Sequence, residues 1–301
     1  MSPLIGDTRS MVNENRAFPE KGCCGICNGR DHSLQLKFSD RRILRCRSCG
    51  IIFSDLIWDR HRIRQLYETP DFFGGDYWQW NGYSALDVLD FPAYDSALLA
   101  AKVLLGGTGR LLDVGCGLGG FLARSLAMRF VTEGTDVSEY ASRIIEQRIG
   151  IAIHLGELPS LHLADGTYDV VSSWDTLEHV LDPRAMLLEM HRLVRPGGVL
   201  ILRTINEDTV LTATANALYR IGIASAAARM HEPYHLYYWT RPLLSRLLTE
   251  CGFTPRVRFD CEIHCGRLGL NKAGRFAMTV MYRTQALLNR EFMQLLVASA
   301  G

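Results

Sequence analysis

After about residue 110, apolar and polar residues follow two alternating periods that predict strands separated by helices. Short apolar runs that end at polar residues indicate buried strands. These runs lie at 111–114, 131–136, 151–155, 170–174 and 199–203. Helical spacing is found at 138–148, at 241–251 and at about 272–289, and further strands are expected at 254–259 and 292–298. We therefore expect an α/β domain whose last two strands form an edge hairpin.

A glycine-rich turn follows the strand at 111–114. Residues 111–120 read Leu-Leu-Asp-Val-Gly-Cys-Gly-Leu-Gly-Gly. Gly115 and Gly117 let the backbone approach a ligand closely, and a helix that begins near residue 118 offers unpaired N–H groups to an anionic group. Gly115, Gly117 and Gly120 also match the spacing G-x-G-x-x-G, so the turn alone leaves a dinucleotide such as NAD open.

Two acids favour S-adenosylmethionine (SAM) over a dinucleotide. Asp113 precedes the first glycine of the turn by two residues. A carboxylate there attracts the α-ammonium group of SAM and repels a pyrophosphate. Asp136 ends the next strand, 21 residues after Gly115, which is a distance that one strand–helix–strand unit spans. It can accept hydrogen bonds from both ribose hydroxyls.

Four cysteines form two pairs near the N-terminus. Cys24 and Cys27 make the first pair, Cys46 and Cys49 the second, and 18 residues separate the pairs. Two such pairs at this spacing are typical of a zinc ribbon, in which four thiolates hold one zinc ion tetrahedrally. Iron in a rubredoxin-like site is the alternative, because thiolate ligands alone do not choose between the two metals. We expect structural zinc.

Positive charge is concentrated around these cysteines. Residues 21–64 contain ten Lys or Arg and four Asp or Glu, a net charge of +6 in a chain whose total is +1. This segment either docks on an acidic surface of the same chain or binds an anionic partner, such as a nucleotide-linked sugar, a carrier-bound intermediate or RNA. Nucleic acid is disfavoured, because a nearly neutral chain would release few counterions and the ribbon has no interleaved aromatic residues.

Five motifs in order resemble a known family. They are the acid-x-Gly-x-Gly turn at 113–117, the acid at 136, Tyr-Asp-Val-Val at 168–171, Leu-Glu-His at 177–179 and Arg-x-x-x-Pro-Gly-Gly at 192–198. With these motifs, residues 77–260 resemble the class I SAM-dependent methyltransferases. The resemblance implies a Rossmann-like sheet of seven strands with helices on both faces, to which the cysteine segment adds a small N-terminal zinc ribbon.

The resemblance also implies roles in cofactor binding. The matching positions are Asp113, Gly115, Gly117, Asp136, Glu157, Leu158 and Trp174. The first three would surround the methionine end of SAM, and Asp136 would hold the ribose. Glu157 would lie near the adenine amino group, the Leu158 backbone would face the ring, and Trp174 would flank the cofactor.

Composition and motifs together divide the chain into four parts. They are a tail at 1–20, the ribbon at 21–64, an aromatic linker with a lid helix at 65–105, and a SAM-binding domain at 106–301 with a substrate-lid insertion at about 206–238. Tyr77 and Tyr83 would line the cofactor lid, unless their segment is a hydrophobic hinge. A homodimer through the apolar insertion stays open. The sequence has no apolar stretch suited to a membrane span or signal peptide, so we expect a cytoplasmic protein.

Candidate catalytic residues follow the strand at 170–174. Methyl transfer requires an aligned nucleophile, exclusion of water and, for a hydroxyl acceptor, a base. Asp175, Glu178 and His179 lie where parallel strands present chemistry at their carboxyl ends, and His235 is a second candidate base. For His179, a structural role with Glu178 in bracing the following loop is the alternative.

Two further resemblances assign this cluster differently. Asp175, Glu178 and His179, with His235 downstream, resemble the metal site of magnesium-dependent O-methyltransferases, including the ubiquinone-type enzymes. Tyr-His-Leu-x-Tyr at 234–238 resembles the deoxysugar C-methyltransferases, which also begin with a zinc module but have Glu where this chain has Tyr234. We expect methylation of a hydroxyl on a small-molecule sugar or natural-product intermediate. The alternatives are C-methylation of a nucleotide-linked deoxyketosugar, ribosomal RNA methylation, and SAM binding without catalysis. A metal-free histidine base is favoured over magnesium, because Asp175 is shorter than the Glu usual at that position.

Overall fold

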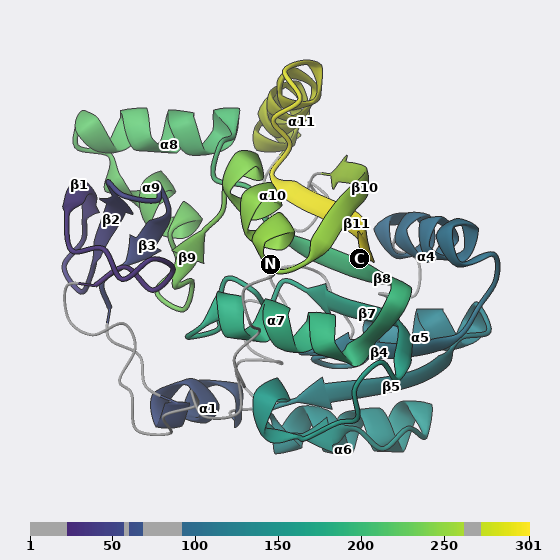
Figure 1. Ribbon diagram of the computed structural model, residues 1–301. Coiled ribbons are helices and arrows are strands. Elements are labelled where there is room, and N and C mark those ends of the chain that lie inside the picture. Colours follow the sequence, from purple (N-terminus) through teal and green to yellow (C-terminus); the bar gives the residue numbers. More distant parts are fainter. Residues whose placement is uncertain (1–22, 57–59, 69–91, 262–271) are drawn as a thin grey trace, which may run out of the picture.

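The computed structural model describes residues 23–56, 60–68, 92–261 and 272–301, which form two β-sheets flanked by helices (Figure 1). The larger sheet has the strand order β10-β11-β8-β7-β4-β5-β6. Its strands are β4 (Arg110–Val114), β5 (Val131–Asp136), β6 (His154–Leu155), β7 (Tyr168–Trp174), β8 (Val194–Ile205), β10 (Phe253–Cys261) and β11 (Met293–Ala300). The five strands from β6 to β8 are parallel, whereas β11 runs antiparallel to both β8 and β10. The expected seven-stranded sheet with an edge hairpin is confirmed.

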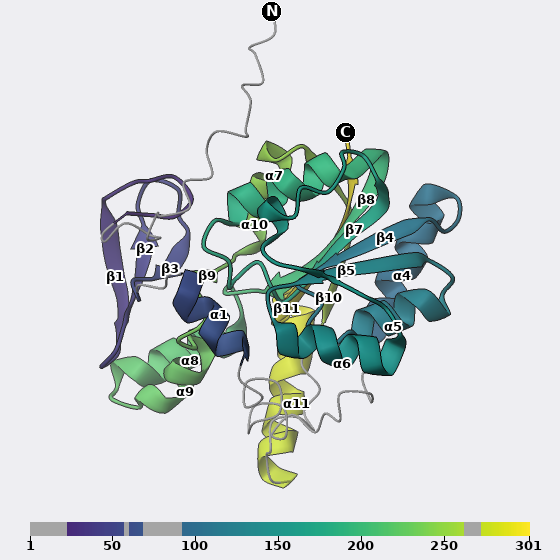
Figure 2. The same cartoon turned by 90° about the horizontal axis from the view of Figure 1, so that it is seen from below.

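Helices cover both faces of this sheet (Figure 2). One face carries α4 (Pro92–Leu105), α5 (Gly120–Ala127) and α6 (Glu139–Ile149), and the other carries α7 (Pro183–Leu193) and α10 (Arg241–Glu250). Along β8, Val199 and Ile201 pack with α4 and α5, while Leu200 and Leu202 pack with α7 and α10. Because both faces are buried, this strand reads as a continuous apolar run.

The smaller sheet belongs mainly to the zinc ribbon. Strands β1 (His32–Lys37), β2 (Arg42–Cys46) and β3 (Ile52–Ser54) pair antiparallel in that order. A fourth strand, β9 (Tyr237–Tyr238), comes from the far end of the predicted insertion and pairs antiparallel with β3. The ribbon sheet is therefore completed by a segment of the larger domain, which the sequence did not predict.

The predicted insertion forms two helices beside the ribbon (Figure 1). They are α8 (Val210–Arg220) and α9 (Ala224–Met230). Thr209 caps α8, because its hydroxyl accepts a hydrogen bond from the Thr212 N–H at 2.9 Å,. Gly222 separates the two helices in a left-handed conformation with φ 93°,. A cleft of about 400 Å³ lies between this insertion and the ribbon, with Arg45, Glu207 and Asn216 in its wall.

Two more helices lie outside the sheet layers. Helix α1 (Arg60–Glu68) rests near α6, where the Ser138 hydroxyl donates to the Tyr67 carbonyl at 2.8 Å. Helix α11 (Lys272–Leu287) leads into β11. Among the described helices, none has the length and apolarity to cross a membrane. The predicted tail at 1–20 lies outside the described residues, and so does the part of the predicted linker at 69–91, which carries Tyr77 and Tyr83, whereas the two ends of that linker fall in α1 and α4.

Several strands differ in length from those expected, β6 and β8 among them. Strand β6 has two residues where 151–155 was predicted, because only Thr135 and Asp136 of β5 pair with it at the sheet edge. Strand β8 begins at Val194, which pairs with Tyr168 before the register shifts. Arg-Pro-Gly-Gly at 195–198 is thus an irregular part of this strand.

Candidate cofactor and acceptor sites

The glycine-rich turn lies at the carboxyl end of β4. Gly115 and Gly117 have φ values of 71° and 52°, a conformation that side chains rarely adopt,. A Cβ on Gly115 would lie 2.5 Å from the Thr176 hydroxyl, so only glycine fits there. A Cβ on Gly117 would meet no atom of the described residues within 4 Å. The space beside Gly117 can therefore admit a ligand.

Asp136 fixes the turn from the end of β5. One carboxylate oxygen accepts the Gly117 N–H at 2.8 Å, and the other accepts the Ser138 N–H at 2.9 Å. Burial raises the pKa of this carboxyl. A carboxylate has about four lone-pair positions, so these two bonds leave acceptor capacity for ligand hydroxyls.

Asp113 is the most buried acid of this turn, with 2% of its surface exposed. Burial raises its pKa to about 8, against the effect of the Ser172 hydroxyl, which donates to it at 2.7 Å, and the negative charge of Asp136 raises it further. A cation placed beside these two carboxyls would offset this cost. The electrostatics of the turn thus favour a positively charged group over a phosphate.

The other proposed cofactor residues have different surroundings. Glu157 and Leu158 follow β6 at the start of η3 (Leu158–Ser160), and the neighbouring Gly156 N–H donates to the Asp136 carbonyl at 2.8 Å. This contact keeps Glu157 and Leu158 near the carboxyl end of β5, where Asp136 lies. Trp174 is buried in an aromatic cluster with Tyr94 and Phe121, at ring distances of 4.6 and 4.8 Å. Its place beside the cofactor stays a prediction, and Tyr83 lies outside the described residues.

A second cluster lies after β7, next to the glycine turn. The Thr176 hydroxyl lies 3.4 Å from the Gly115 carbonyl, to which it donates. Glu178 and His179 follow shortly after Thr176 along the chain, and His235 joins them from a distant segment. A carboxylate oxygen of Glu178 and a ring nitrogen of each histidine lie within 4.8 Å of one another. The structure therefore gathers three of the four proposed catalytic residues beside the proposed cofactor turn.

Asp175 points to a different partner. Its carboxylate forms a two-pronged ion pair with the largely buried Arg203, whose Nε donates to Oδ1 at 2.9 Å. Arg203 lies on β8 opposite Trp174, the residue that precedes Asp175. Asp175 also has a positive φ of 51°, which is uncommon for a residue with a side chain,.

Glu178 is almost fully buried and is held by Thr204. The Thr204 hydroxyl donates to its Oε2 at 2.7 Å. Burial and then the negative charge of Asp175 raise the pKa of Glu178 to about 8. The Glu178 backbone carbonyl also accepts the N–H of Leu236 at 2.8 Å. Glu178 therefore braces the segment that carries His235, which fits the structural role considered for the Glu-His pair.

The two histidines are uncharged bases in this setting. His179 Nδ1 lies 3.0 Å from the Tyr234 carbonyl, so this nitrogen carries the proton and Nε2 is left as the acceptor,. The rings of His179 and His235 are 4.7 Å apart. Burial lowers the pKa of His179, and burial lowers that of His235 well below its usual value, because a second positive charge beside the other histidine rings would be repelled. The buried Nδ1 of His235 has no hydrogen-bond partner among the described residues.

The four cysteines of the ribbon converge as predicted. Their sulfur atoms all lie within 4.8 Å of one another, with Cys24 and Cys49 at 3.6 Å and Cys27 and Cys46 at 3.5 Å. Four thiolates at about 2.3 Å from one zinc ion lie about 3.8 Å apart in a tetrahedron. The donor set and its spacing therefore fit zinc.

Several contributing residues were missed from the sequence. Thr176 contacts the glycine turn, Ser172 donates a hydrogen bond to Asp113, Thr204 donates one to Glu178, and Arg203 forms an ion pair with Asp175. All four lie within or just after the adjacent strands β7 and β8. Polar side chains inside or just after otherwise apolar strands were the sequence signal that could have indicated these four residues.

Comparison with known proteins places the chain in a family. Residues 90–256, more than half of the chain, match the methyltransferase domain family, and the chain belongs to it. It is 36% identical over 106 residues to a ubiquinone biosynthesis O-methyltransferase of Pseudomonas aeruginosa, covering 33% of this chain and 45% of that protein. It is 30% identical over 158 residues to the protein of that name from Pseudomonas savastanoi pv. phaseolicola, covering 48% of this chain and 68% of that protein. The chain thus spans about half of the length of the first of these relatives.

Solved structures show the same fold. Magnesium protoporphyrin IX methyltransferase from Synechocystis PCC 6803, solved with bound SAH, has a TM-score of 0.54 at 18% identity, covering 81% of this chain and 100% of that chain. A SAM-dependent methyltransferase from Thermotoga maritima, described as a possible histamine N-methyltransferase, has a TM-score of 0.51 at 21% identity, covering 76% and 97%. The fold is that of the class I SAM-dependent methyltransferases.

Proposed function

We propose that the protein transfers a methyl group from SAM to a hydroxyl of a small-molecule acceptor, a sugar or natural-product intermediate that is free or carrier-bound. One observation carries this proposal: two half-buried histidines, whose pKa values burial lowers, lie beside a glycine turn whose acids favour a cationic ligand. The relatives that match the central part of the chain are O-methyltransferases, which supports O-methylation over C-methylation.

For cofactor binding, we propose that Asp113 faces the ammonium group of SAM and Asp136 the ribose hydroxyls. Gly117 leaves room for the methionine end, because no described atom lies within 4 Å of its Cβ position. Glu157 and the Leu158 backbone remain proposed contacts of the adenine, and Trp174 remains a proposed neighbour of the cofactor. SAM supplies an electrophilic methyl group, so the chain needs to bind, align and exclude water around the acceptor.

For catalysis, we propose that His235 or His179 accepts the proton of the acceptor hydroxyl. His179 Nε2 is free to accept because Nδ1 is bonded to the Tyr234 carbonyl. The lowered pKa of each ring keeps it in the basic form through neutral pH,. Methyl transfer should therefore be constant through neutral pH and should fall only at acidic pH, below the ordinary histidine value of about 6.5.

We propose that this step needs no magnesium. Magnesium prefers near-octahedral oxygen ligands. The Asp175 carboxylate is bound to Arg203, and the remaining cluster of Glu178, His179 and His235 offers two nitrogens and one oxygen. In the ribbon, by contrast, we propose one structural zinc ion on Cys24, Cys27, Cys46 and Cys49.

A methyl-transfer screen tests this function. Purified protein is incubated with SAM carrying a labelled methyl group and a panel of sugar, nucleotide-sugar and phenolic hydroxyl acceptors, and products are read by mass spectrometry. We expect the product to be a methyl ether. The rate of its formation should not change when a weak chelator is added, under conditions in which elemental analysis still finds one zinc ion per chain. A product methylated on carbon, transfer to RNA only, or loss of activity on chelation with zinc retained would each reject part of the proposal. Absence of zinc from carefully prepared protein would reject the ribbon assignment.

A further inference from the structure

The segment that carries His235 is held between the ribbon and the end of β7. On the ribbon side, the Ser54 N–H donates to the Leu236 carbonyl at 3.0 Å, and β3 pairs with β9 directly afterwards. On the other side, the Leu236 N–H donates to the Glu178 carbonyl at 2.8 Å. The ribbon therefore fixes the chain immediately after His235.

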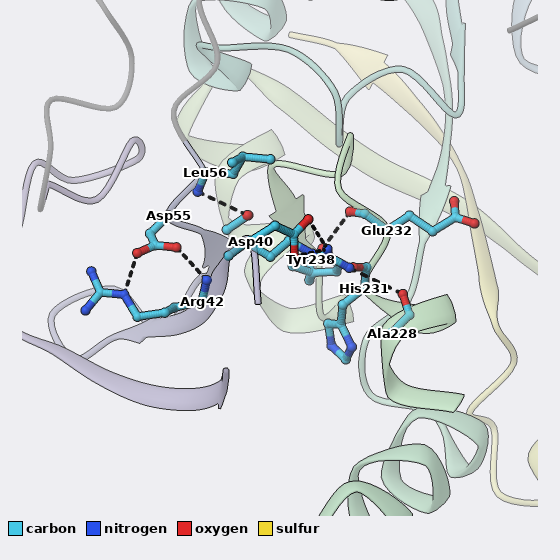
Figure 3. A network of polar contacts seen from close by, with 10 residues as sticks. Asp40, Arg42, Asp55, Leu56, Ala228, His231, Glu232 and Tyr238 are labelled. Atoms are coloured by element: carbon cyan, nitrogen blue, oxygen red, sulfur yellow. Dashed lines mark hydrogen bonds and ion pairs between the residues drawn. The ribbon is translucent and has the colours of Figure 1, made fainter. Parts of the chain in front are cut away.

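Arg41 fixes the chain before His235. It lies in the turn between β1 and β2 and is only 8% exposed. Its Nε donates to the His231 carbonyl at 3.0 Å, and its Nη2 donates to the same carbonyl. Nη2 also donates to the Ala228 carbonyl at 3.4 Å. Nη1 donates to both carboxylate oxygens of Asp40 at 2.8 Å. Figure 3 draws the network of polar contacts in this region, with Asp40, Ala228 and His231 among the labelled residues.

These carbonyls belong to the carboxyl end of α9 and the residue after it. Such carbonyls lack partners within the helix and attract a cation. The guanidinium meets both of them and Asp40 at once because its donors form a rigid planar fork, which lysine lacks. The His231 ring is locked as well, since its nitrogens lie 2.9 Å from the Ala227 carbonyl and 3.1 Å from Glu207.

Only Glu232, Pro233, Tyr234 and His235 lie between the two anchors. We infer that Arg41 is a positioning residue for the acceptor site: by holding the His231 carbonyl, this ribbon residue sets where His235 and the Tyr234 carbonyl stand beside His179. That His235 acts on an acceptor rests on the proposed function, whereas the anchoring itself does not. The basic ribbon thus docks on its own chain through at least this arginine.

The test compares Arg41→Met and Arg41→Lys with Arg42→Met. Arg42 is the adjacent residue, more than half exposed and paired with Asp55 inside the ribbon at 2.5 Å, so its loss removes an arginine without touching residues 231–238. Amide hydrogen exchange reports the protection of each segment. Labelled histidine rings report the surroundings of His235 by NMR, with His191 as an internal reference on α7.

In Arg41→Met we expect the amides of 235–238 to exchange about tenfold faster or more, and the His235 ring signal to shift or broaden. The glycine turn at 111–120, strand β2 and the His191 signal should stay unchanged, and Arg41→Lys should show a smaller loss. With an acceptor in hand, the rate of methyl transfer should fall while SAM affinity stays constant.

Unchanged exchange at 235–238 would overturn the inference. So would an equal effect in Arg42→Met, or equal loss of protection across the whole ribbon, which would mean that Arg41 only stabilises the ribbon. If Arg41→Met does not fold, Arg41→Lys decides by the same readouts. These readouts need no ligand, so a failure of SAM binding would reject the proposed function and leave the role of Arg41 standing.

Discussion

The proposed cofactor and acceptor sites lie side by side at the carboxyl ends of the parallel strands, and burial acts on them in opposite ways. On the cofactor side it raises the pKa of Asp113 to about 8, so that this acid gains its charge fully when a cation arrives,. On the acceptor side it lowers the pKa of His179 and His235, so that each ring stays uncharged and able to accept a proton. The same desolvation prepares one side for a charged ligand and the other for base catalysis.

The two sides also differ in how they are assembled. The cofactor side comes from β4, the turn, and the end of β5, which are close in sequence. The acceptor side joins β7, β8, the segment around β9 and, through Arg41 and β3, the ribbon. Damage to the cofactor side should therefore act on SAM binding, and damage to the acceptor side on the rate.

The largest expected effect is on the acceptor side. His235→Ala should lower the rate of methyl transfer about 10²-fold or more, because a positioned base contributes about 10²–10⁴-fold. SAM affinity should stay constant in calorimetry, since this side chain lies outside the proposed cofactor contacts. A rate close to that of the original protein would remove His235 as the base and leave His179 to be tested in the same way.

A matched pair of glycines sharpens the cofactor side. Gly117 and Gly106 both have positive φ, 52° and 72°, and neither Cβ position meets a described atom within 4 Å. Changing either to Ala should cost about 1–2 kcal/mol of unfolding free energy, because a left-handed backbone is strained for alanine. Only Gly117→Ala should also weaken SAM binding, by about tenfold or more.

Gly106 is the control for this comparison because it lies before β4, at the opposite end of the strand from the turn. Thermal unfolding measures the common cost, and calorimetry measures the difference. Equal SAM affinities in the two variants would show that the space beside Gly117 is not part of the cofactor site.

The smallest expected effect is a released proton. At pH 7 the pKa of about 8 keeps most Asp113 side chains protonated in the free protein. A cation nearby favours the ionised form, so SAM binding should release a fraction of a proton, and this fraction should shrink as the pH rises above 8. The number of protons released can be measured by calorimetric titration at one pH in two buffers of different ionisation enthalpy, because the difference in binding heat is proportional to that number. Asp113→Asn is the control, and an unchanged release in that variant would assign the proton to another group.

The difference between the two sides also explains what the sequence could predict. Asp113, Gly115 and Gly117 were predictable as a unit, because one strand and its turn bring them together without help from distant segments. The four ribbon cysteines were predictable for a similar reason, since their spacing alone leaves one convergent arrangement. The seven strands followed from their apolar runs, although several of their bounds, those of β6 and β8 included, did not.

The acceptor side was predicted only in part, because long-range contacts decide it. The sequence predicted Glu178 and His179 as candidates after β7, and it grouped Asp175 with them. In the structure, Arg203 on the adjacent strand forms an ion pair with the Asp175 carboxylate instead. Strand β9 has only two residues, and its partner β3 lies in the other domain. Arg41 was one of ten basic residues in its segment, and only docking against α9 distinguishes it.

Calorimetric titration with SAM, its demethylated product SAH and NAD tests the central claim, that the turn after β4 is a SAM site with Asp136 on the ribose. We predict micromolar binding of SAM and SAH and no binding of NAD. Asp136→Ala should weaken SAM binding by about 1.5–3 kcal/mol, because hydrogen bonds to a charged group are lost. Binding of NAD, or the same SAM affinity in Asp136→Ala, would contradict the assignment.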